Sequence, residues 1–227
     1  MKRFLKKDYE NLITIEVVCH GVPSPLLWRK YVEWLEGQYH AKVVNVNFRS
    51  KNEGWKLFCL EEEFENGIVR SENLKKDIYM KLFLNNFCLR PSCYECKTRC
   101  VSDIILGDLW GIQEILPEWD DDKGTSMILV NSVKGNKLFE SIKDKMEYRE
   151  VDIEQAVKHN PSVYISVLKP VERDEFFEEL QVLPFDELKK KYEKILKTKD
   201  NKLILKKIMY YIKHTLLLII KKVDNYK

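Results

Sequence analysis

Three closely spaced cysteines constrain this chain more than any other feature of its sequence. They follow the pattern Cys88-x4-Cys93-x2-Cys96, and the segment 102–111, which ends in Gly-Asp-Leu-Trp-Gly, comes soon after them. Soft thiolate ligands select iron–sulfur clusters, zinc or cuprous copper. An x4, x2 spacing with a distant fourth cysteine is one of the patterns that hold ferredoxin-type clusters. The spacing therefore predicts a thiolate-bound metal centre, and an iron–sulfur cluster in particular.

Two other cysteines could complete a four-thiolate site. Cys100 follows the three closely, and Cys19 ends a predicted strand before a loop that contains proline and glycine. The neighbouring His20 could ligate or transfer protons, although a histidine in such a loop is more often only structural. Zinc is the alternative to a cluster, but structural zinc sites favour two paired short spacings, and a loop without metal is the third alternative. Cys59, in a predicted strand, is expected to be a buried structural cysteine.

Composition and charge exclude several functions. Hydrophobic residues make up 44% of the 227 positions, enough to bury a core, and 39 basic against 36 acidic side chains leave a net charge of only +3. So small a charge does not favour nucleic-acid binding. The segment 1–8 is basic but lacks the apolar stretch of a secretion signal, which predicts a cytoplasmic location. Six cysteines without a signal are better interpreted as reduced or metal-bound thiols than as disulfides.

Hydrophobic periodicity predicts a mixed α/β (α+β) fold, with a central mixed sheet, flanking helices, a cysteine-rich metal loop and a helical C-terminal appendage. Segments 42–49 and 55–60 are expected to pair as a hairpin, and Gly37 to end the first helix. The predicted strands are 11–19, 42–49, 55–60, 103–107 and 126–131, and the predicted helices are 26–37, 74–86, 135–146, 152–159 and 172–180.

Two loops could hold a flavin or its phosphates. The loop 49–55 combines two cations, a glycine and an indole, which could clamp a phosphate and stack on a planar ring. The loop 121–126 runs into a predicted strand, so its amides and hydroxyls could hold an anion, although it lacks the order of a Walker A loop. The structural alternative for the loop 49–55 is a solvated turn with a tryptophan in the core. The alternative for Asp108 is an aspartate that only caps its turn. The candidate contacts are Arg49, Lys51, Trp55, Asp108, Lys123, Gly124, Thr125 and Ser126.

The end of the chain differs in character from the rest. Pro184 begins a lysine-rich, glycine-free stretch with apolar positions at helical spacing, so we expect one domain over 1–183 and a helical extension over 184–227. Its most apolar part, 208–220, is too short for a membrane span. The segment is expected to pack on its own domain or a partner, with attachment to an anionic membrane surface as the alternative.

With these motifs in chain order, the sequence resembles the C-terminal domain of the coenzyme F420 hydrogenase/dehydrogenase beta-subunit family. The resemblance rests on ordered motifs that extend over about residues 10–180. The matching stretches are 18–25, 48–55, 88–97, 103–111 and 123–126, with weaker matches at 159–161 and 173–177.

The resemblance implies an oxidoreductase of the iron–sulfur flavoprotein type, which passes electrons between a cluster, FAD and a deazaflavin such as coenzyme F420 or another acceptor. It implies Cys19, Cys88, Cys93 and Cys96 as ligands of a 4Fe-4S cluster, with Cys100 as the alternative fourth ligand. Bacterial relatives accompany polysaccharide-biosynthesis enzymes. The family's ferredoxin-like and N-terminal domains are expected to be missing, so the expected partner is either a redox partner protein or the missing domains supplied in trans. The competing hypothesis is a non-enzymatic accessory module stabilised by zinc or a cluster.

Overall fold

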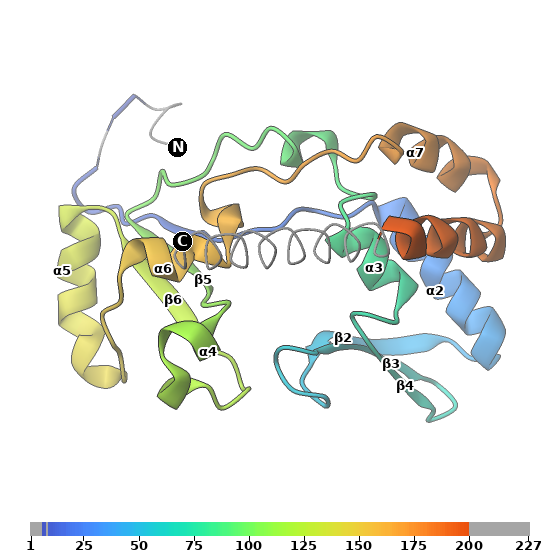
Figure 1. Cartoon of the computed structure of the whole chain (residues 1–227), viewed down its shortest axis with the longest axis horizontal. Coiled ribbons are helices and arrows are strands. Elements are labelled where there is room, and N and C mark those ends of the chain that lie inside the picture. The colour runs from blue at the N-terminus through green and yellow to red at the C-terminus, as the bar shows by residue number, and fades with distance from the viewer. Residues whose placement is uncertain (1–5, 8, 200–227) are drawn as a thin grey trace, which may run out of the picture. The chain divides into compact units, whose positions relative to one another are not determined.

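The computed structural model describes residues 6–199 except residue 8 (Figure 1). The chain divides into two compact units, residues 1–176 and 177–227. Helix α7 (Arg173–Val182) continues across the division. Within the second unit, a further helix covers residues 185–199, and its Tyr192 hydroxyl donates to Glu179 Oε2 at 3.1 Å. The apolar segment 208–220 lies outside the described residues. The predicted domain boundary at 183/184 stays a prediction.

The mixed α+β class is confirmed, but the strands form two separate three-stranded sheets instead of one central sheet. The first sheet is mixed and has the order β1-β5-β6. Strand β1 (Ile15–Val17) runs parallel to β5 (Ile104–Asp108), and β6 (Ser126–Val130) pairs antiparallel with β5. Because β5 is the middle strand and is covered on both faces, its first two isoleucines are at most 4% exposed.

The second sheet is an antiparallel meander of β2 (Val43–Ser50), β3 (Cys59–Phe64) and β4 (Val69–Asn73). The predicted hairpin is confirmed, although β3 begins at Cys59 and not at residue 55. The segment before it is a loop, since the Trp55 amide donates to the Asp122 carbonyl at 2.8 Å instead of joining the ladder. Within the part of the chain that the structure describes, the three strands pair only with one another.

Polar side chains cap the N-termini of four of the described helices of the first unit. Ser24, Asp77, Ser132 and Asp152 each accept a hydrogen bond from a first-turn amide, as residues at this position are expected to do. The first helix continues past Gly37 and ends at Tyr39, because His40 adopts the left-handed conformation that terminates it. The helices are α2 (Pro25–Tyr39), α3 (Ile78–Leu84), α4 (Ile112–Ile115), α5 (Val133–Ile142) and α6 (Ile153–Lys158), and the short 3₁₀ turns are η1 (Pro91–Cys93), η2 (Pro117–Trp119), η3 (Lys143–Lys145) and η4 (Pro161–Val163).

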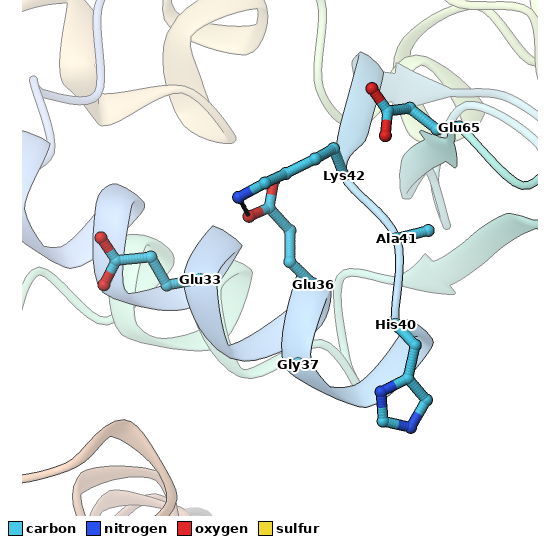
Figure 2. A pocket seen from close by; sticks show the side chains of 7 residues that line it. All are labelled: Glu33, Glu36, Gly37, His40, Ala41, Lys42 and Glu65. Carbon is cyan, nitrogen blue, oxygen red and sulfur yellow. Dashed lines mark hydrogen bonds and ion pairs between the residues drawn. The ribbon is translucent and has the colours of Figure 1, made fainter.

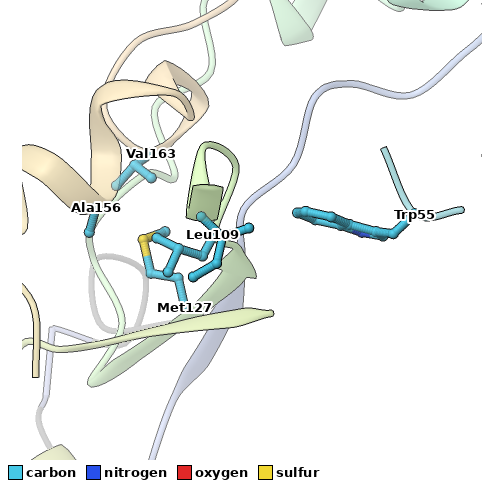
Figure 3. Close-up of a cluster of buried hydrophobic side chains, with 6 residues drawn as sticks. Trp55, Leu109, Met127, Ala156 and Val163 are labelled. Carbon is cyan, nitrogen blue, oxygen red and sulfur yellow. The ribbon is translucent and has the colours of Figure 1, made fainter. Parts of the chain in front are cut away.

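An apolar cluster packs against one face of the mixed sheet (Figure 3). Met127 contributes from β6, Leu109 from the end of β5, and Ala156 and Val163 from the α6–η4 region, with each of the four at most 4% exposed. Their burial fixes the turn that follows β5, and this turn carries the Gly-Asp-Leu-Trp-Gly motif. Over the residues that the structure describes, no helix combines the length and the apolarity required to cross a bilayer.

Candidate metal centre and cofactor loops

Three of the predicted metal ligands, Cys19, Cys93 and Cys96, line one small pocket of about 90 Å³. We call it the thiol pocket. One thiol comes from the segment that follows β1, and the other two come from the loop around η1. The full lining is Glu16, Val17, Cys19, His20, Gly21, Cys93, Cys96, Thr98 and Arg99.

Backbone pairing between two distant segments brings these thiols together. The Ser24 amide donates to the Cys88 carbonyl at 2.8 Å, and the Arg90 amide donates to the Val22 carbonyl at 3.0 Å. Gly21 makes the approach close, since a Cβ there would lie 2.6 Å from Leu89 Cδ1. The segments 21–24 and 88–90 are therefore held side by side, which brings Cys19 to the cysteine loop.

Two of the pocket sulfurs already have hydrogen-bond partners. The Val22 amide donates to Cys93 Sγ at 3.3 Å, and Cys96 Sγ lies 3.3 Å from Thr98 Oγ1. The hydrogen bonds from Thr98 lower the pKa of the Cys96 thiol from its ordinary value. Because the thiolate is the form that binds metal, this arrangement favours ligation at Cys96.

The other three cysteines do not line the thiol pocket. Cys88 is fully buried, and burial raises the pKa of its thiol to about 12. Cys100 is exposed, and its sulfur donates to the Val163 carbonyl at 3.2 Å. Cys59 is buried on β3. The assignment of Cys88 or Cys100 as the fourth ligand therefore stays a prediction.

The thiols of this pocket are the soft donor type that iron–sulfur clusters and zinc ions both take. Within the described ranges, no three His, Cys, Asp or Glu side chains gather around one ion position. A tetrahedral zinc site needs four ligands about 2.3 Å from one ion, whereas a cluster spreads its thiolates because each of them binds a different iron. Three soft thiols around a common pocket, with an amide that donates to one sulfur, match the donor set of a cluster.

His20 also lines this pocket, but its ring nitrogen is already engaged. Nε2 lies 3.1 Å from the Phe83 carbonyl, and the ring packs edge-on against that phenyl group with 4.9 Å between centroids. Burial lowers the pKa of the imidazole. A carbonyl can only accept, so Nε2 carries a proton and is not a metal-ligating nitrogen in this arrangement.

The two predicted cofactor loops are brought together in space. Arg49 Nη1 lies 2.8 Å from Asp108 Oδ2, and Lys51 Nζ donates to the Lys123 carbonyl at 2.5 Å. Lys56 adds an ion pair to Asp120 at 2.5 Å. Loops that lie about 60 to 70 residues apart in sequence therefore form one polar surface, with a guanidinium that is half exposed.

Trp55 is part of the framework of these loops. Its ring stacks on Trp110 with 4.2 Å between centroids and an angle of 7°, and only 3% of the residue is exposed. Gly124 lies against the indole, where a Cβ would come within 2.9 Å of the ring. The indole is already covered here, so direct stacking of Trp55 on a flavin stays a prediction.

The remaining predicted contacts occupy the strand end beside these loops. Ser126 is opposite Asp108 in the β5–β6 ladder, and the Thr125 carbonyl accepts from the Leu109 amide at 2.9 Å. The side chain of Lys123 is 82% exposed. Of this group, the exposed lysine is therefore the side chain with most freedom to contact a ligand.

Several residues around these sites had no individual role in the sequence-based prediction. Arg99 and Thr98 line the thiol pocket, and Asn160 donates from Nδ2 to the Asp108 carbonyl at 3.1 Å. His159 packs on Gly111, and its Nε2 lies 3.0 Å from Glu114 Oε2. The weak family match at 159–161 was the sequence signal for His159 and Asn160. For Arg99, the only sequence signal was its position among the cysteines.

A wider pocket of about 490 Å³ lies at the end of α2 and has a different character (Figure 2). Three glutamates surround it, and one of them, Glu36, already pairs with Lys42 at 2.7 Å. The lining of this wider pocket contains no cysteine. His40 belongs to the lining because it is the residue that terminates α2. Nothing in this lining matches the redox chemistry predicted from the sequence.

The sequence profile for the C terminus of the coenzyme F420 hydrogenase/dehydrogenase beta subunit matches residues 1–156. The match therefore includes both the thiol pocket and the two cofactor loops. No curated protein and no solved structure matches the chain.

Proposed function

Because this chain belongs to the family formed by the C-terminal part of the coenzyme F420 hydrogenase/dehydrogenase beta subunit, a redox family, we propose that it is an electron-relay domain of an oxidoreductase. In this proposal the thiol pocket holds an iron–sulfur cluster, and the loops 49–55 and 121–126 bind a flavin or deazaflavin. The observation that carries the proposal is the convergence of Cys19, Cys93 and Cys96 on one pocket.

The parallel pairing of β1 and β5 supports a common location for the two proposed sites. Strands β1 and β5 are parallel, and Val17 pairs with Leu106. Continuing that register puts Cys19 beside Asp108, at the edge where the neighbouring strands β1 and β5 end, and Asp108 pairs with Arg49 of the loop 49–55 at 2.8 Å. Ligands of α/β proteins commonly bind at this edge. A short path between two redox groups is what an electron relay requires.

The cluster, when bound, would supply one-electron transfer, and the flavin would connect it to two-electron chemistry. The chain's own groups would set the conditions for both. The Val22 amide and the Thr98 hydroxyl would donate to the ligand sulfurs, which stabilises negative charge on them. Arg49, held by Asp108 and lying 5.8 Å from the Trp110 ring, would contact the flavin phosphate.

Metal analysis after anaerobic purification of the whole chain tests the proposal. We expect a brown protein in which acid-labile sulfide matches iron. Cys19→Ser, Cys93→Ser and Cys96→Ser should each lose most of the iron, whereas Cys59→Ser, outside the thiol pocket, should retain it. Comparing Cys88→Ser with Cys100→Ser identifies the fourth ligand. One zinc per chain without sulfide, or equal iron in all the variants, would contradict the proposal.

A further inference from the structure

We propose that Arg99 is a positioning residue that donates its Nε–H to a sulfur of the centre in the thiol pocket and raises the midpoint potential of that centre. The inference rests on the proposed function, because it requires a cluster. It adds a residue that neither the cysteine spacing nor the sequence-based choice of cofactor contacts included.

The first observation is a buried donor without an acceptor. Arg99 lines the thiol pocket together with the three cysteines. Its Nη1 donates to the Ser162 carbonyl, which anchors the end of the side chain, while Nε is buried and has no hydrogen-bond partner. A buried donor that stays unpaired is unfavourable, so an acceptor is expected at this position when the pocket is filled.

The second observation is that the nearby carboxylate has other partners. Glu16 lines the same pocket, but its oxygens accept from the Cys100 amide at 3.2 Å, the Val101 amide at 3.3 Å and the Ser102 hydroxyl at 3.3 Å. No ion pair joins Glu16 to Arg99 among the contacts of the described residues. The guanidinium charge is therefore available to whatever fills the pocket.

The third step is chemical. Hydrogen bonds to the sulfurs, net charge and burial set the potential of a thiolate-bound cluster, and one-electron reduction adds a negative charge to it. A fixed cation with an N–H directed at sulfur stabilises the reduced state more than the oxidised state. Arg99 is the cationic side chain among the described residues that line the pocket, so its loss should make the cluster harder to reduce.

Redox titration of anaerobically purified, full-length protein tests this role, with the fraction reduced followed by electron paramagnetic resonance. We expect Arg99→Gln to decrease the ratio of reduced to oxidised cluster about tenfold at a fixed potential, a downward midpoint shift of about 59 mV for one electron. Arg99→Lys keeps the charge but loses the Nε–H, so it should shift the midpoint in the same direction by a smaller amount. Arg90→Gln, an exposed residue outside the pocket, is the matched control and should have the wild-type midpoint.

The results separate this inference from the proposed function. Wild-type protein without iron and sulfide would overturn the proposed function. A wild-type cluster whose midpoint is equal in Arg99→Gln and Arg90→Gln would overturn only the role of Arg99. Loss of the cluster from both Arg99 variants would also overturn it, because Arg99 would then be needed to build the site and not to set its potential.

Discussion

Tyr31 lies at the centre of a buried polar network that contains two carboxyls and one guanidinium. Its hydroxyl is 2.8 Å from Glu62 Oε1 and 2.7 Å from Asp77 Oδ2, and it accepts from Arg70 Nη1 at 2.9 Å. A phenol has one proton and cannot donate to both carboxyls. Burial raises the pKa of the fully buried Glu62. The shift means that Glu62 binds a proton more readily in the folded chain than in the unfolded chain, even though Arg70 pairs with it at 2.8 Å.

The raised pKa of Glu62 makes the free energy of unfolding depend on pH with a defined sign. Because burial raises its folded pKa, Glu62 holds more proton in the folded state than in the unfolded state at pH values above about 4.3, the ordinary pKa of a glutamate. As pH rises from there to its raised folded pKa, its contribution to the free energy of unfolding should fall by up to about 1.4 kcal/mol per pH unit. Glu62→Gln should remove this slope and gain relative to wild type as pH rises. Urea denaturation at several pH values measures the difference.

The matched control for that experiment is Glu63→Gln, because Glu63 is exposed on the same strand. Its difference from wild type should lack the slope assigned to Glu62. A wild-type advantage over Glu62→Gln that grows with pH would show that Glu62 is ionised in the folded protein.

Gly54 allows the loop 49–55 to contact the loop 121–126. Its φ is +90°, and a Cβ there would lie 1.9 Å from Asp122 Oδ2. That carboxylate cannot move freely, because its other oxygen accepts from the Lys56 amide at 3.0 Å. Gly54→Ala should therefore add a steric penalty of about 1–3 kcal/mol to the usual strain of a positive φ.

Gly67→Ala isolates the steric part of this effect. Gly67 has a similar φ of +82°, and a Cβ added there would have nothing within 4 Å, so its substitution should cost only the backbone strain, about 1 kcal/mol. Urea midpoints of the two variants measure the difference. Equal losses of stability would show that the carboxylate moves aside without cost.

The sequence identified which thiols line the pocket, but it did not predict the environment of each candidate residue. The cysteine pattern and the family resemblance named Cys19, Cys93 and Cys96, and these three line one pocket. The sequence could not show that Cys88 is buried or that Trp55 is covered by Trp110. Both depend on contacts between segments far apart in the chain, and hydrophobic periodicity contains no information about such contacts.

At the scale of elements, periodic segments were predicted well and short polar ones were not. The helix α2 and the hairpin β2–β3 follow from amphipathic patterns. Strand β4 has the sequence Val-Arg-Ser-Glu-Asn, which shows no apolar alternation. It forms because β3 offers an unpaired edge and because Arg70 on β4 pairs with Glu62 at 2.8 Å. Tertiary partners, and not local propensity, decide such a strand.

Asp103 joins three elements of the mixed sheet region. Its Oδ2 accepts from the Thr14 amide at 2.8 Å and hydroxyl at 2.7 Å, just before β1, and its Oδ1 accepts from Ser132 Oγ at 2.7 Å, at the start of α5. In Asp103→Asn, one of the two accepting oxygens becomes an NH₂ group, which is itself a donor and faces the donors of Thr14 or Ser132. Because hydrogen bonds to a buried charge contribute about 1.5–3 kcal/mol each, we expect a loss of about 2 kcal/mol, measured by urea denaturation.

The control for Asp103 is Asp144→Asn, an exposed aspartate in η3. It should change stability by less than about 0.5 kcal/mol, as most surface substitutions do. A loss in Asp103→Asn no greater than this would contradict the role of Asp103 as the junction of β1, β5 and α5.

At the scale of the whole molecule, the parallel pair β1 and β5 explains why the two candidate sites belong together. The strands lie about 90 residues apart in sequence, and only their pairing brings the segment after Val17 to the turn after Asp108. The sequence suggested both sites but not their adjacency, since parallel pairing is a long-range property. The proposed electron relay depends on this adjacency more than on any single residue.

The proposal also predicts that cluster and flavin occupy separate sites. Arg49→Gln removes the guanidinium paired with Asp108, so it should weaken FAD binding about tenfold, the effect of about 1.4 kcal/mol that is typical of a lost charge-assisted contact, while iron and sulfide stay at the wild-type level. Cys93→Ser should do the opposite, losing iron and keeping the affinity for FAD. Fluorescence titration with FAD and metal analysis on the same samples measure both effects. Lys137→Gln, on the exposed surface of α5, is the control for the loss of one positive charge. If Arg49→Gln and Lys137→Gln bind FAD equally well, the flavin site does not lie at these loops.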